Sequence, residues 1–457
     1  MIISLGKKVI KTIMCLLLLV TVGCQLQQSQ VSSPKTTQPN VVLILSDDQS
    51  WCDYGFMGHD IIQTPHLDTL ASEGVLFERG YVPTALCRAS LSTIATGHYA
   101  STHRIIGNDP KDKTNNNRQA MIDRANGFDT IAELLGEQGY LSHQSGKWWE
   151  GNYQAGGFTH GMTRGFPEPG GRHGDDGLRI GRDGIAPVTD FIDHAVAKDK
   201  PFFVWYAPFM PHSPHTPPKR LLDKYIAKVD SIHVAKYYAM VEWFDETCGD
   251  LLGYLDKKNV RDNTLVIYIS DNGWIQDPHS KRFAFGSKQM PQEGGVRQPT
   301  IYSWPNTIKP ARRNDLVSSI DILPTICAAT GARTPDDLPG LNLFDAMVKN
   351  KTIERTKLFG ESFAHDLIDL DNPYKTLLYR WVIQGQYKLI LSYNGENQKY
   401  LFVHDQMDKQ PQLYDVIKYP YEKHNLAKER PKKVAKLVKA LDDWYQVTEV
   451  SCLKTYQ

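Results

Sequence analysis

The segment NVVLILSDDQ, residues 40–49, joins a run of mainly aliphatic residues directly to a run of polar ones. The segment TLVIYISDNG, residues 264–273, has the same order, and PFFVWY at residues 201–206 is a third apolar run. Uninterrupted runs of this length, rich in β-branched and aromatic residues, are typical of strands buried on both faces of a sheet. Helices cover both faces of parallel sheets. The three runs therefore predict the centre of a parallel sheet.

Segments with helical spacing of apolar residues separate these runs. Residues 128–137, 234–255 and 320–329 each place apolar residues on one side of a helix. Strands interleaved with helices predict an α/β fold, with a large, mainly parallel sheet sandwiched by helices. Two Gly-, Pro- and Asp-rich stretches, residues 151–190 and 277–295, predict long loops, and loops of this length are usually functional.

The pattern changes near residue 375. Short strand-like runs come before a charged helical segment at residues 431–445, which predicts a small antiparallel sheet with a terminal helix. We therefore predict a catalytic domain over residues 40–374 and a C-terminal subdomain over residues 375–457. The strand-like runs are residues 380–384, 387–393 and 400–404.

The N-terminal segment predicts export. Basic residues precede an apolar run at residues 12–22, which is about half of the roughly 20 residues that span a bilayer. We predict a signal peptide over residues 1–23 and a polar tether over residues 24–39. A small residue before Cys24 resembles a bacterial lipoprotein processing site, which predicts a lipid on Cys24 and a place in the periplasm or on the outer-membrane or cell surface. Its membrane contact would be the lipid alone. Plain secretion is the alternative.

Charge and cysteine content exclude several classes of protein. The 52 Lys and Arg residues nearly balance the 51 Asp and Glu residues, so the net charge gives no reason to expect a nucleic-acid partner. The 7 cysteines are too few and too scattered for a disulfide framework in a chain of 457 residues. The sequence has no closely spaced Cys and His pattern of the kind that binds zinc.

Carboxylate and amide side chains follow two of the predicted strands. Asp47 and Asp48 follow the first, and Asp271 and Asn272 follow another. Ligands of open α/β sheets bind at the carboxyl ends of strands, and neighbouring carboxylates repel each other unless a cation lies between them. Carboxylate and amide oxygens suit Ca²⁺ or Mg²⁺. The alternative is that Asp47 caps a helix and the second group is a turn. The matched positions after two core strands favour the metal site.

Several further motifs occur in a fixed order along the chain. Together they resemble the type I, formylglycine-dependent sulfatases of the alkaline phosphatase superfamily, and this resemblance implies an alkaline phosphatase-like fold. In that family a Cys or Ser within C-x-P-x-R is oxidised to formylglycine. The matching motifs are Ser46-Asp47-Asp48-Gln49, Cys87-Arg88-Ala89-Ser90-Leu91 before Thr96-Gly97, Gly146-Lys147-Trp148, Pro211-His212, Ser270-Asp271-Asn272-Gly273, and Lys288 before Glu293-Gly294-Gly295-Val296-Arg297.

The resemblance implies the chemistry of the site. Cys87 would be oxidised to formylglycine (3-oxoalanine) by a formylglycine-generating or sulfatase-maturating enzyme, and the aldehyde hydrate would attack sulfur. Ca²⁺, rather than Mg²⁺, would bind Cys87 with the four oxygen donors and lower the pKa of the nucleophile. Lysine charges would stabilise the sulfate oxygens. The residues that the resemblance assigns to catalysis are Cys87, Lys147, His212 and Lys288.

The chain departs from the family pattern in the nucleophile motif. Leu91 stands where the family has Arg, and Ala89 stands where it has Pro. Arg88 directly follows the Cys, and we predict that it supplies the missing charge from a neighbouring position. The alternative is that Arg88 is an ordinary surface arginine.

A second departure follows Lys147. Trp149 stands where the family has His, and His160 or His143 would replace that histidine in space. For Trp149 we predict core packing rather than stacking on a sugar. Further polar residues are predicted to line the substrate pocket, although solvated turns or structural roles are the alternatives. These substrate-binding candidates are His103, Asn108, Asp109, His160 and His215.

The predicted substrate is a sulfated poly- or oligosaccharide, because export suits an enzyme that acts on extracellular glycans. Algal polysaccharides such as ulvan and glycosaminoglycans both fit. A phosphoesterase or phosphonate hydrolase on the same scaffold is an alternative enzyme, since its needs for metal and lysine overlap. A sulfated-glycan binding protein that has lost turnover through Leu91 and Trp149 is the alternative without catalysis.

Overall fold

The NVVLIL segment forms β1 (Asn40–Ser46), in the middle of an eight-stranded sheet. The computed structural model describes residues 38–453, so the predicted signal peptide, most of the tether and Cys24 lie outside the described residues. The strands run across the sheet in the order β10, β2, β9, β8, β1, β7, β5, β6. Their bounds are β2 (Val75–Phe77), β5 (Leu141–Gly146), β6 (His160–Gly161), β7 (Phe202–Ala207), β8 (Thr264–Ser270), β9 (Thr300–Ser303) and β10 (Ala311–Arg313).

The centre of this sheet is parallel, as predicted. β1 pairs in parallel with β7 and β8, and β7 pairs in parallel with β5, whereas β9 runs antiparallel to β8 and β2. Ser46 lies opposite Ser270, and Gly146 lies opposite Ala207. The neighbouring strands β8, β1, β7 and β5 therefore end at the same edge, and the residues that follow them share that edge.

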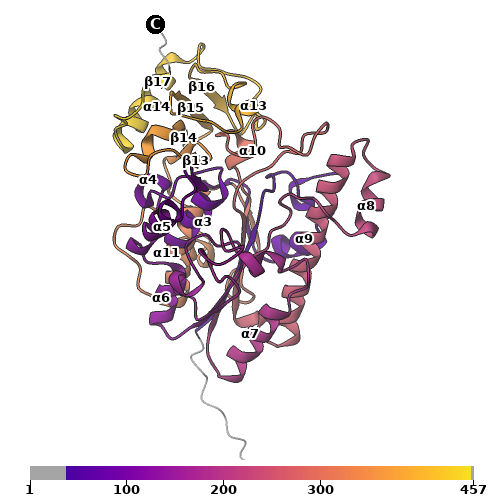
Figure 1. The fold of residues 1–457 in the computed structure, drawn as a ribbon. Coiled ribbons are helices and arrows are strands. Elements are labelled where there is room, and N and C mark those ends of the chain that lie inside the picture. Colours follow the sequence, from indigo (N-terminus) through magenta and orange to yellow (C-terminus); the bar gives the residue numbers. More distant parts are fainter. Residues whose placement is uncertain (1–37, 454–457) are drawn as a thin grey trace, which may run out of the picture. The chain divides into compact units, whose positions relative to one another are not determined.

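Helices cover both faces of the sheet (Figure 1). Val41, Leu43 and Leu45 of β1 point into one core with α3 (Cys87–Thr96), α6 (Ile131–Glu137) and α11 (Ile322–Thr330). Val42 and Ile44 point into the other core with α2 (Pro65–Glu73), α7 (Ala186–Ala197) and α9 (Ile232–Lys257). These side chains are fully buried, and each such burial stabilises the fold by about 1.5–3 kcal/mol. The absence of a polar face on β1 follows from this double covering.

Capping residues set where the predicted helices begin. The helix predicted at 128–137 begins at Ile131, because Thr130 and Glu133 form a capping box. The helix predicted at 234–255 begins at Ile232, because the hydroxyl of Ser231 accepts hydrogen bonds from the first turn. The helix predicted at 320–329 is a 3₁₀ turn, η6 (Ser319–Asp321), continued by α11.

A small antiparallel sheet forms in the C-terminal part of the chain. Its strands are β12 (Leu358–Phe363), β14 (Leu377–Gln384), β15 (Tyr387–Tyr393) and β16 (Gln412–Asp415), and β17 (Cys452–Leu453) pairs with β15. The helix α14 (Pro431–Trp444) packs against β14 and β15. The strands predicted at 380–384 and 387–393 and the terminal helix are therefore confirmed. The first strand of this sheet, β12, comes from residues before 375.

The strand predicted at 400–404 is wrong. This segment forms a single helical turn, α13 (Leu401–His404). Tyr400 has a left-handed backbone with φ of 55°, which ends the extended conformation. Its carbonyl oxygen then accepts a hydrogen bond from the N–H of Val403 at 3.0 Å. The apolar residues of this segment suggested a strand, but the left-handed backbone of Tyr400 at its start favours a turn instead.

Shorter elements connect these layers. Two small pairs of strands are parallel: β3 with β11 and β4 with β13. The remaining strands and helices are β3 (Gly80–Tyr81), β4 (Asp109–Pro110), β11 (Val317–Ser318), β13 (Asp366–Leu367), α4 (Ala100–His103), α5 (Asn115–Asp123), α8 (Lys219–Ile226), α10 (Glu293–Val296) and α12 (Phe344–Val348). The remaining 3₁₀ helices are η1 (Gly55–Met57), η2 (Ala125–Gly127), η3 (Gln154–Gly156), η4 (Asp175–Arg179), η5 (Arg261–Asn263) and η7 (Pro373–Thr376).

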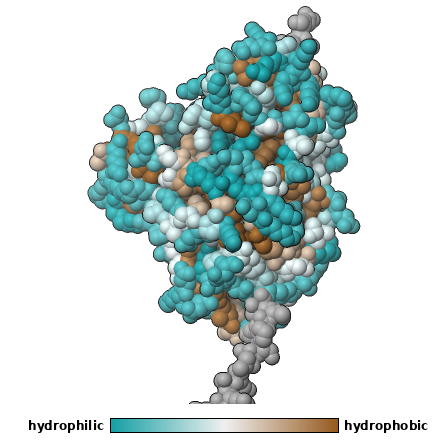
Figure 2. Space-filling view, turned by 180° about the vertical axis from the view of Figure 1, so that it is seen from behind, coloured by the Kyte–Doolittle hydropathy of each residue, from teal (hydrophilic) through white to brown (hydrophobic). Residues whose placement is uncertain are grey.

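The surface seen from behind carries hydrophilic residues over most of its area, with small separate hydrophobic patches (Figure 2). Within residues 38–453, no helix has the length and apolar character needed to cross a bilayer.

Candidate active site

The residues that follow β8, β1, β7 and β5 are tied to one another by backbone hydrogen bonds. The N–H of Asp47 donates to the carbonyl of Met210 at 3.0 Å, and the N–H of Asp271 donates to the carbonyl of Ser46 at 2.9 Å. The N–H of Lys147 donates to the carbonyl of Ala207 at 2.7 Å. The sheet therefore places the predicted metal and sulfate-binding segments side by side.

The backbone of Asp48 is strained at this edge. Its φ of 65° lies in the left-handed region, which is uncommon for a residue with a side chain. Its N–H donates to Asp271 Oδ1 at 3.1 Å, and Asn272 Nδ2 donates to Asp48 Oδ1 at 2.6 Å. These bonds hold Asp48, Asp271 and Asn272 together, and strain of this kind is concentrated at functional sites.

Two buried lysines neutralise the carboxylates. Lys147 Nζ lies 2.7 Å from Asp47 Oδ1, and Lys288 Nζ lies 2.7 Å from Asp48 Oδ2. His212 Nε2 lies 3.2 Å from Lys288 Nζ and 3.3 Å from Asp48 Oδ2. The predicted lysines and histidine thus converge with the predicted acids.

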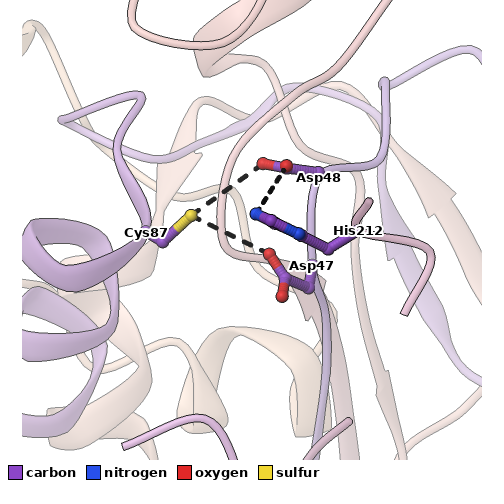
Figure 3. A group of neighbouring side chains, drawn as sticks. All are labelled: Asp47, Asp48, Cys87 and His212. Carbon is purple, nitrogen blue, oxygen red and sulfur yellow. Dashed lines mark hydrogen bonds and ion pairs between the residues drawn. The ribbon is translucent and has the colours of Figure 1, made fainter. Parts of the chain in front are cut away.

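Cys87 lies at the first position of α3 and is buried. Its Sγ lies 3.8 Å from Asp47 Oδ1 and 3.9 Å from Asp48 Oδ1. Figure 3 shows the sulfur facing both carboxylates and a dashed line that joins a ring nitrogen of His212 to Asp48. The N-terminal end of a helix favours negative charge, so this position suits an anionic nucleophile or a bound anion.

Burial and neighbouring charges shift the proton equilibria of the cluster. Burial raises the pKa of Asp47, and it raises the pKa of the Cys87 thiol. Burial opposes the charge of Lys147 and Lys288, but the nearby carboxylates outweigh it and raise the pKa of both amines. Burial, followed by the charges of Lys147 and Lys288, lowers the pKa of His212 well below its usual value. Near neutral pH both lysines are charged and His212 is neutral.

The donor set fits a divalent cation. Within residues 38–453, the buried oxygens Asp271 Oδ2 and Asn272 Oδ1 have no hydrogen-bond partner, which is unfavourable unless another group binds them. Burial raises the pKa of Asp271, and the charge of Asp48 adds to that rise. A cation would relieve both effects. The clustered ligand atoms of Asp47, Asp48, Cys87 and His212 all lie within 4.8 Å of one another.

Arg88 does not reach this cluster. Its guanidinium donates to Glu150 through Nε at 2.8 Å and through a terminal nitrogen at 2.6 Å. The backbone N–H of Arg88 donates to Asn108 Oδ1 at 3.1 Å. Arg88 is 3% exposed and Glu150 is 6% exposed, so Arg88 is not a surface arginine. The structure places the charge of Arg88 in a buried ion pair beside the start of α3.

The predicted substrate-pocket residues divide into two groups. His103 is buried, and its Nε2 lies 3.1 Å from the hydroxyl of Thr93, which is about two helical turns along α3 from Cys87. His160 packs against Phe191 and His194. Three others lie nearer the site. Asn108 accepts a hydrogen bond from the backbone N–H of Arg88 at the start of α3, Asp109 forms an ion pair with Arg172, and the His215 ring lies 5.8 Å from the Trp274 ring.

His143 and His160 do not occupy the place of the missing family histidine, because both pack against Phe191 of α7. His173 lies nearer the cluster. Its ring is 5.3 Å from the Trp149 ring, and burial, with the charges of Lys147 and Arg172, lowers its pKa to about 3. The buried Nδ1 of His173 has no hydrogen-bond partner in the part of the chain that the structure describes.

Trp149 is 5% exposed and packs in the core with α3, as predicted. Its ring also faces Lys147, whose Nζ lies 5.2 Å from the ring centroid. The side chain therefore helps to enclose the lysine that binds Asp47.

Sequence reasoning missed Glu150, Arg172, His173 and His365. Arg172 donates to both carboxylate oxygens of Asp109, at 2.8 and 3.0 Å through Nε. His365 lies 3.3 Å from Asn108 Nδ2, because β4 pairs with β13. The Gly-rich loop around Arg172 was a usable signal, since we expected residues 151–190 to be functional. The pairing that brings His365 to the site joins positions far apart in the sequence.

Comparison with known proteins agrees with this geometry. The family described as Sulfatase matches residues 39–332, which is more than half of the chain. The chain belongs to the sulfatase family. A second family, described as N-sulphoglucosamine sulphohydrolase, C-terminal, matches residues 282–448.

Relatives of this sulfatase align over most of its length. The N-acetylgalactosamine-6-sulfatase of Mus musculus is 28% identical over 75% of this chain and 72% of its own length. The N-acetylgalactosamine-6-O-sulfatase of Bacteroides thetaiotaomicron is 24% identical over 92% of this chain and 96% of its own length. A solved sulfatase from Pseudoalteromonas sp. has a TM-score of 0.70 at 20% identity, over 91% of this chain and 92% of that one. The sulfatase is a sulfuric ester hydrolase with an alkaline phosphatase-like fold.

Proposed function

We propose that this sulfatase hydrolyses sulfate esters of a sulfated poly- or oligosaccharide, with formylglycine at position 87 and Ca²⁺ as its cofactors. The observation that carries this proposal is the position of Cys87. Its sulfur lies 3.8 and 3.9 Å from two carboxylates that are paired with buried lysines. Structural buried cysteines pack mainly as small apolar groups, whereas reactive ones occur at helix N-termini beside basic side chains, so the surroundings of Cys87 support a role in chemistry.

The proposed cofactors would be held by the residues described above. Asp47, Asp48, Asp271 and Asn272 would hold the cation, and their all-oxygen character favours Ca²⁺ or Mg²⁺ over softer-ligand metals. Such a cation would supply a Lewis acid for the sulfate oxygens and a lower pKa for the nucleophile. Formylglycine at position 87, hydrated by water, would supply a hydroxyl nucleophile, and its second hydroxyl would lose its proton to re-form the aldehyde as sulfate leaves.

The two lysines bind and orient the sulfate group. Both are charged and buried, so their attraction for sulfate oxygens is weakly screened. They approach from Asp47 on one side and Asp48 on the other, which suits an anion held between them. Negative charge that develops during S–O cleavage is stabilised by the same two point charges.

Lys288 and His212 together supply a proton to the leaving alcohol. His212 Nδ1 lies 2.6 Å from the carbonyl oxygen of Ser213, which can only accept, so Nδ1 carries the proton of the neutral ring. His212 Nε2 then accepts from Lys288 Nζ at 3.2 Å. Asp48 and His212 therefore accept two of the three protons of the Lys288 ammonium and orient it, and the third proton is the one transferred to the leaving oxygen.

A carbohydrate substrate is supported by the surroundings of the site and by the relatives. Asn108, Asp109 and Arg172 offer hydrogen-bonding groups beside Cys87, and Tyr400 and Phe402 offer aromatic faces. Two of the aligned relatives are named for the 6-sulfate of N-acetylgalactosamine. We propose a glycosaminoglycan or an algal polysaccharide such as ulvan as the substrate class.

The test is sulfate release by protein that was produced with a sulfatase-maturating enzyme. Trypsin frees residues 80–88, GYVPTALCR, so mass spectrometry of this peptide reports conversion of the Cys87 thiol to the aldehyde. Converted protein should release sulfate from sulfated oligosaccharides, measured by ion chromatography, and Cys87→Ala should release none. Converted protein that cleaves phosphate or phosphonate esters faster than sulfate esters would favour the alternative enzyme. Unconverted protein that binds sulfated glycan without turnover would favour the binding protein.

A further inference from the structure

A pocket of about 370 Å³ opens directly from the sulfate-binding residues. His212 and Lys288 form part of its lining, so it is continuous with the site that holds the scissile sulfate. Its volume lies in the range of about 300–1,000 Å³ that is usual for small-molecule sites. A group attached to the leaving oxygen would enter this pocket.

Aromatic rings form one wall of the pocket. The Phe283 ring lies 5.3 Å from the Trp274 ring and 5.4 Å from each of the Tyr400 and Phe402 rings. Phe283 and Trp274 are buried, whereas Tyr400 and Phe402 are half-buried and keep part of their surface open to the pocket. Half-buried aromatic faces suit the apolar faces of a sugar ring.

Two further basic side chains, Lys281 and Arg282, line the pocket. Lys281 and Arg282 are exposed and belong to the loop between β8 and α10. Within the described part of the chain, neither Lys281 nor Arg282 forms an ion pair with a carboxylate. The described residues that line the pocket include no acidic residue. Arg282 lies over the Phe402 ring at 5.0 Å, which orients its guanidinium along the aromatic wall.

We propose that this pocket binds a sugar with a second anionic group, a sulfate or a carboxylate, which Lys281 and Arg282 bind while the scissile sulfate lies at Lys147 and Lys288. This inference rests on the proposed function and specifies its substrate. Uncompensated basic groups beside an aromatic wall are suited to an anionic sugar and gain little from a neutral one. The enzyme therefore prefers glycans with more than one negative charge near the cleaved ester.

The side chains of Lys281 and Arg282 can be removed without loss of the loop's own bonds. The carbonyl oxygen of Arg282 accepts from the Asp277 N–H at 3.0 Å and from Gln276 Nε2 at 3.1 Å, and both bonds use the backbone of residue 282. A Lys281→Ala/Arg282→Ala variant keeps them. Lys432→Ala/Lys436→Ala removes the same charge from exposed positions of α14 outside the pocket and is the matched control.

The test compares three forms of one disaccharide: with the scissile sulfate alone, with a second sulfate, and with a carboxylate. Converted wild-type enzyme should have a kcat/KM about 10-fold higher for one or both of the doubly charged forms, in the range of charge-assisted hydrogen bonds. The Lys281→Ala/Arg282→Ala variant should lose this preference and keep the kcat/KM for the singly charged form within about twofold. The control variant should behave like wild type, and the preferred form identifies the second group.

Equal kcat/KM for all three forms in the wild-type enzyme, or an equal fall for all three in the variant, overturns the inference. Absence of sulfate release from converted enzyme would instead contradict the proposed function. In that case calorimetric titration with the doubly charged disaccharides still decides the matter. Binding that the variant weakens about 10-fold supports the pocket assignment, and binding that the variant leaves unchanged overturns it.

Discussion

Arg88 and Glu150 form a buried ion pair directly beside Cys87, the proposed nucleophile. Breaking one partner of such a pair leaves an uncompensated buried charge, which destabilises a protein by about 3–5 kcal/mol. We expect Arg88→Met to lower the free energy of unfolding by this amount, measured by urea denaturation. Arg88→Met/Glu150→Met should recover most of the loss, because an apolar pair can replace a buried ion pair.

The exposed ion pair between Arg333 and Glu137 provides the control for this experiment. Arg333 lies 3.0 Å from Glu137, and both side chains are about half exposed. Arg333→Met should leave the urea midpoint nearly unchanged, because exposed ion pairs are screened by water. A similar small effect of Arg88→Met would contradict a structural role for the Arg88–Glu150 pair.

His103 makes the stability of the protein depend on pH. Its Nδ1 accepts a hydrogen bond from the Ile105 N–H at 3.0 Å, and burial lowers its pKa to about 3. The unfolded chain binds a proton at this residue near pH 6.5, so the stability it contributes is present above that pH and is lost as the pH falls toward 3. The advantage of wild type over His103→Gln in unfolding free energy should shrink by about 2 kcal/mol between pH 7 and pH 5. An advantage that is constant with pH would contradict a neutral, buried His103.

At the scale of elements, the end of β5 depends on a glycine. Gly146 has φ of 87°, and a Cβ there would lie 1.7 Å from the Ala207 carbonyl oxygen. This close approach allows Lys147 to bond Ala207 and reach Asp47. Gly146→Ala should lower the free energy of unfolding by about 3 kcal/mol or more.

Gly136 in α6, unlike Gly146, lies where a side chain can be added without a clash. A Cβ at Gly136 meets no atom within 4 Å, and its backbone is helical. Gly136→Ala should therefore stabilise the protein by about 0.5–1 kcal/mol. Thermal unfolding of both variants separates the two expectations, and a stable Gly146→Ala protein would contradict the close approach at β5.

The sequence predicted the elements that carry strong local signals. Apolar runs identified β1, β7 and β8, and the acids after two of them identified the edge where the site forms. Loops carried weaker signals, because their conformation depends on contacts between distant positions. His173 and Arg172 reach the site through a long loop, so only their presence in a region expected to be functional could be predicted.

At the scale of the whole molecule, buried ion pairs connect the small C-terminal sheet to the candidate active site. Lys388 of β15 is fully buried and lies 2.9 Å from Glu293 and 3.1 Å from Glu422. Glu293 begins α10, shortly after Lys288, and Tyr81 donates to its carboxylate at 2.9 Å. Residues after 375 therefore help to hold in place the segment that carries Lys288. This coupling was not visible in the sequence, where the two parts differ in pattern.

Lipid attachment at Cys24 stays a proposal about the whole molecule in the cell. In a bacterial host with lipoprotein processing, wild-type protein should sediment with membranes. Cys24→Ala should appear in the soluble periplasmic or extracellular fraction, because its membrane contact would be the lipid alone. Immunoblots of the separated fractions provide the measurement. A wild-type protein that is fully soluble would favour plain secretion.

Calcium titration of chelator-treated protein tests the central claim that the acids after β1 and β8 share one cation. Calorimetry should show about one Ca²⁺ bound per chain in wild type and in Asp337→Asn, an exposed control. Asp47→Asn/Asp271→Asn should bind none while keeping the circular dichroism of the folded protein. Folded wild-type protein that binds no divalent cation, or a double variant that binds Ca²⁺ as wild type does, would contradict the account.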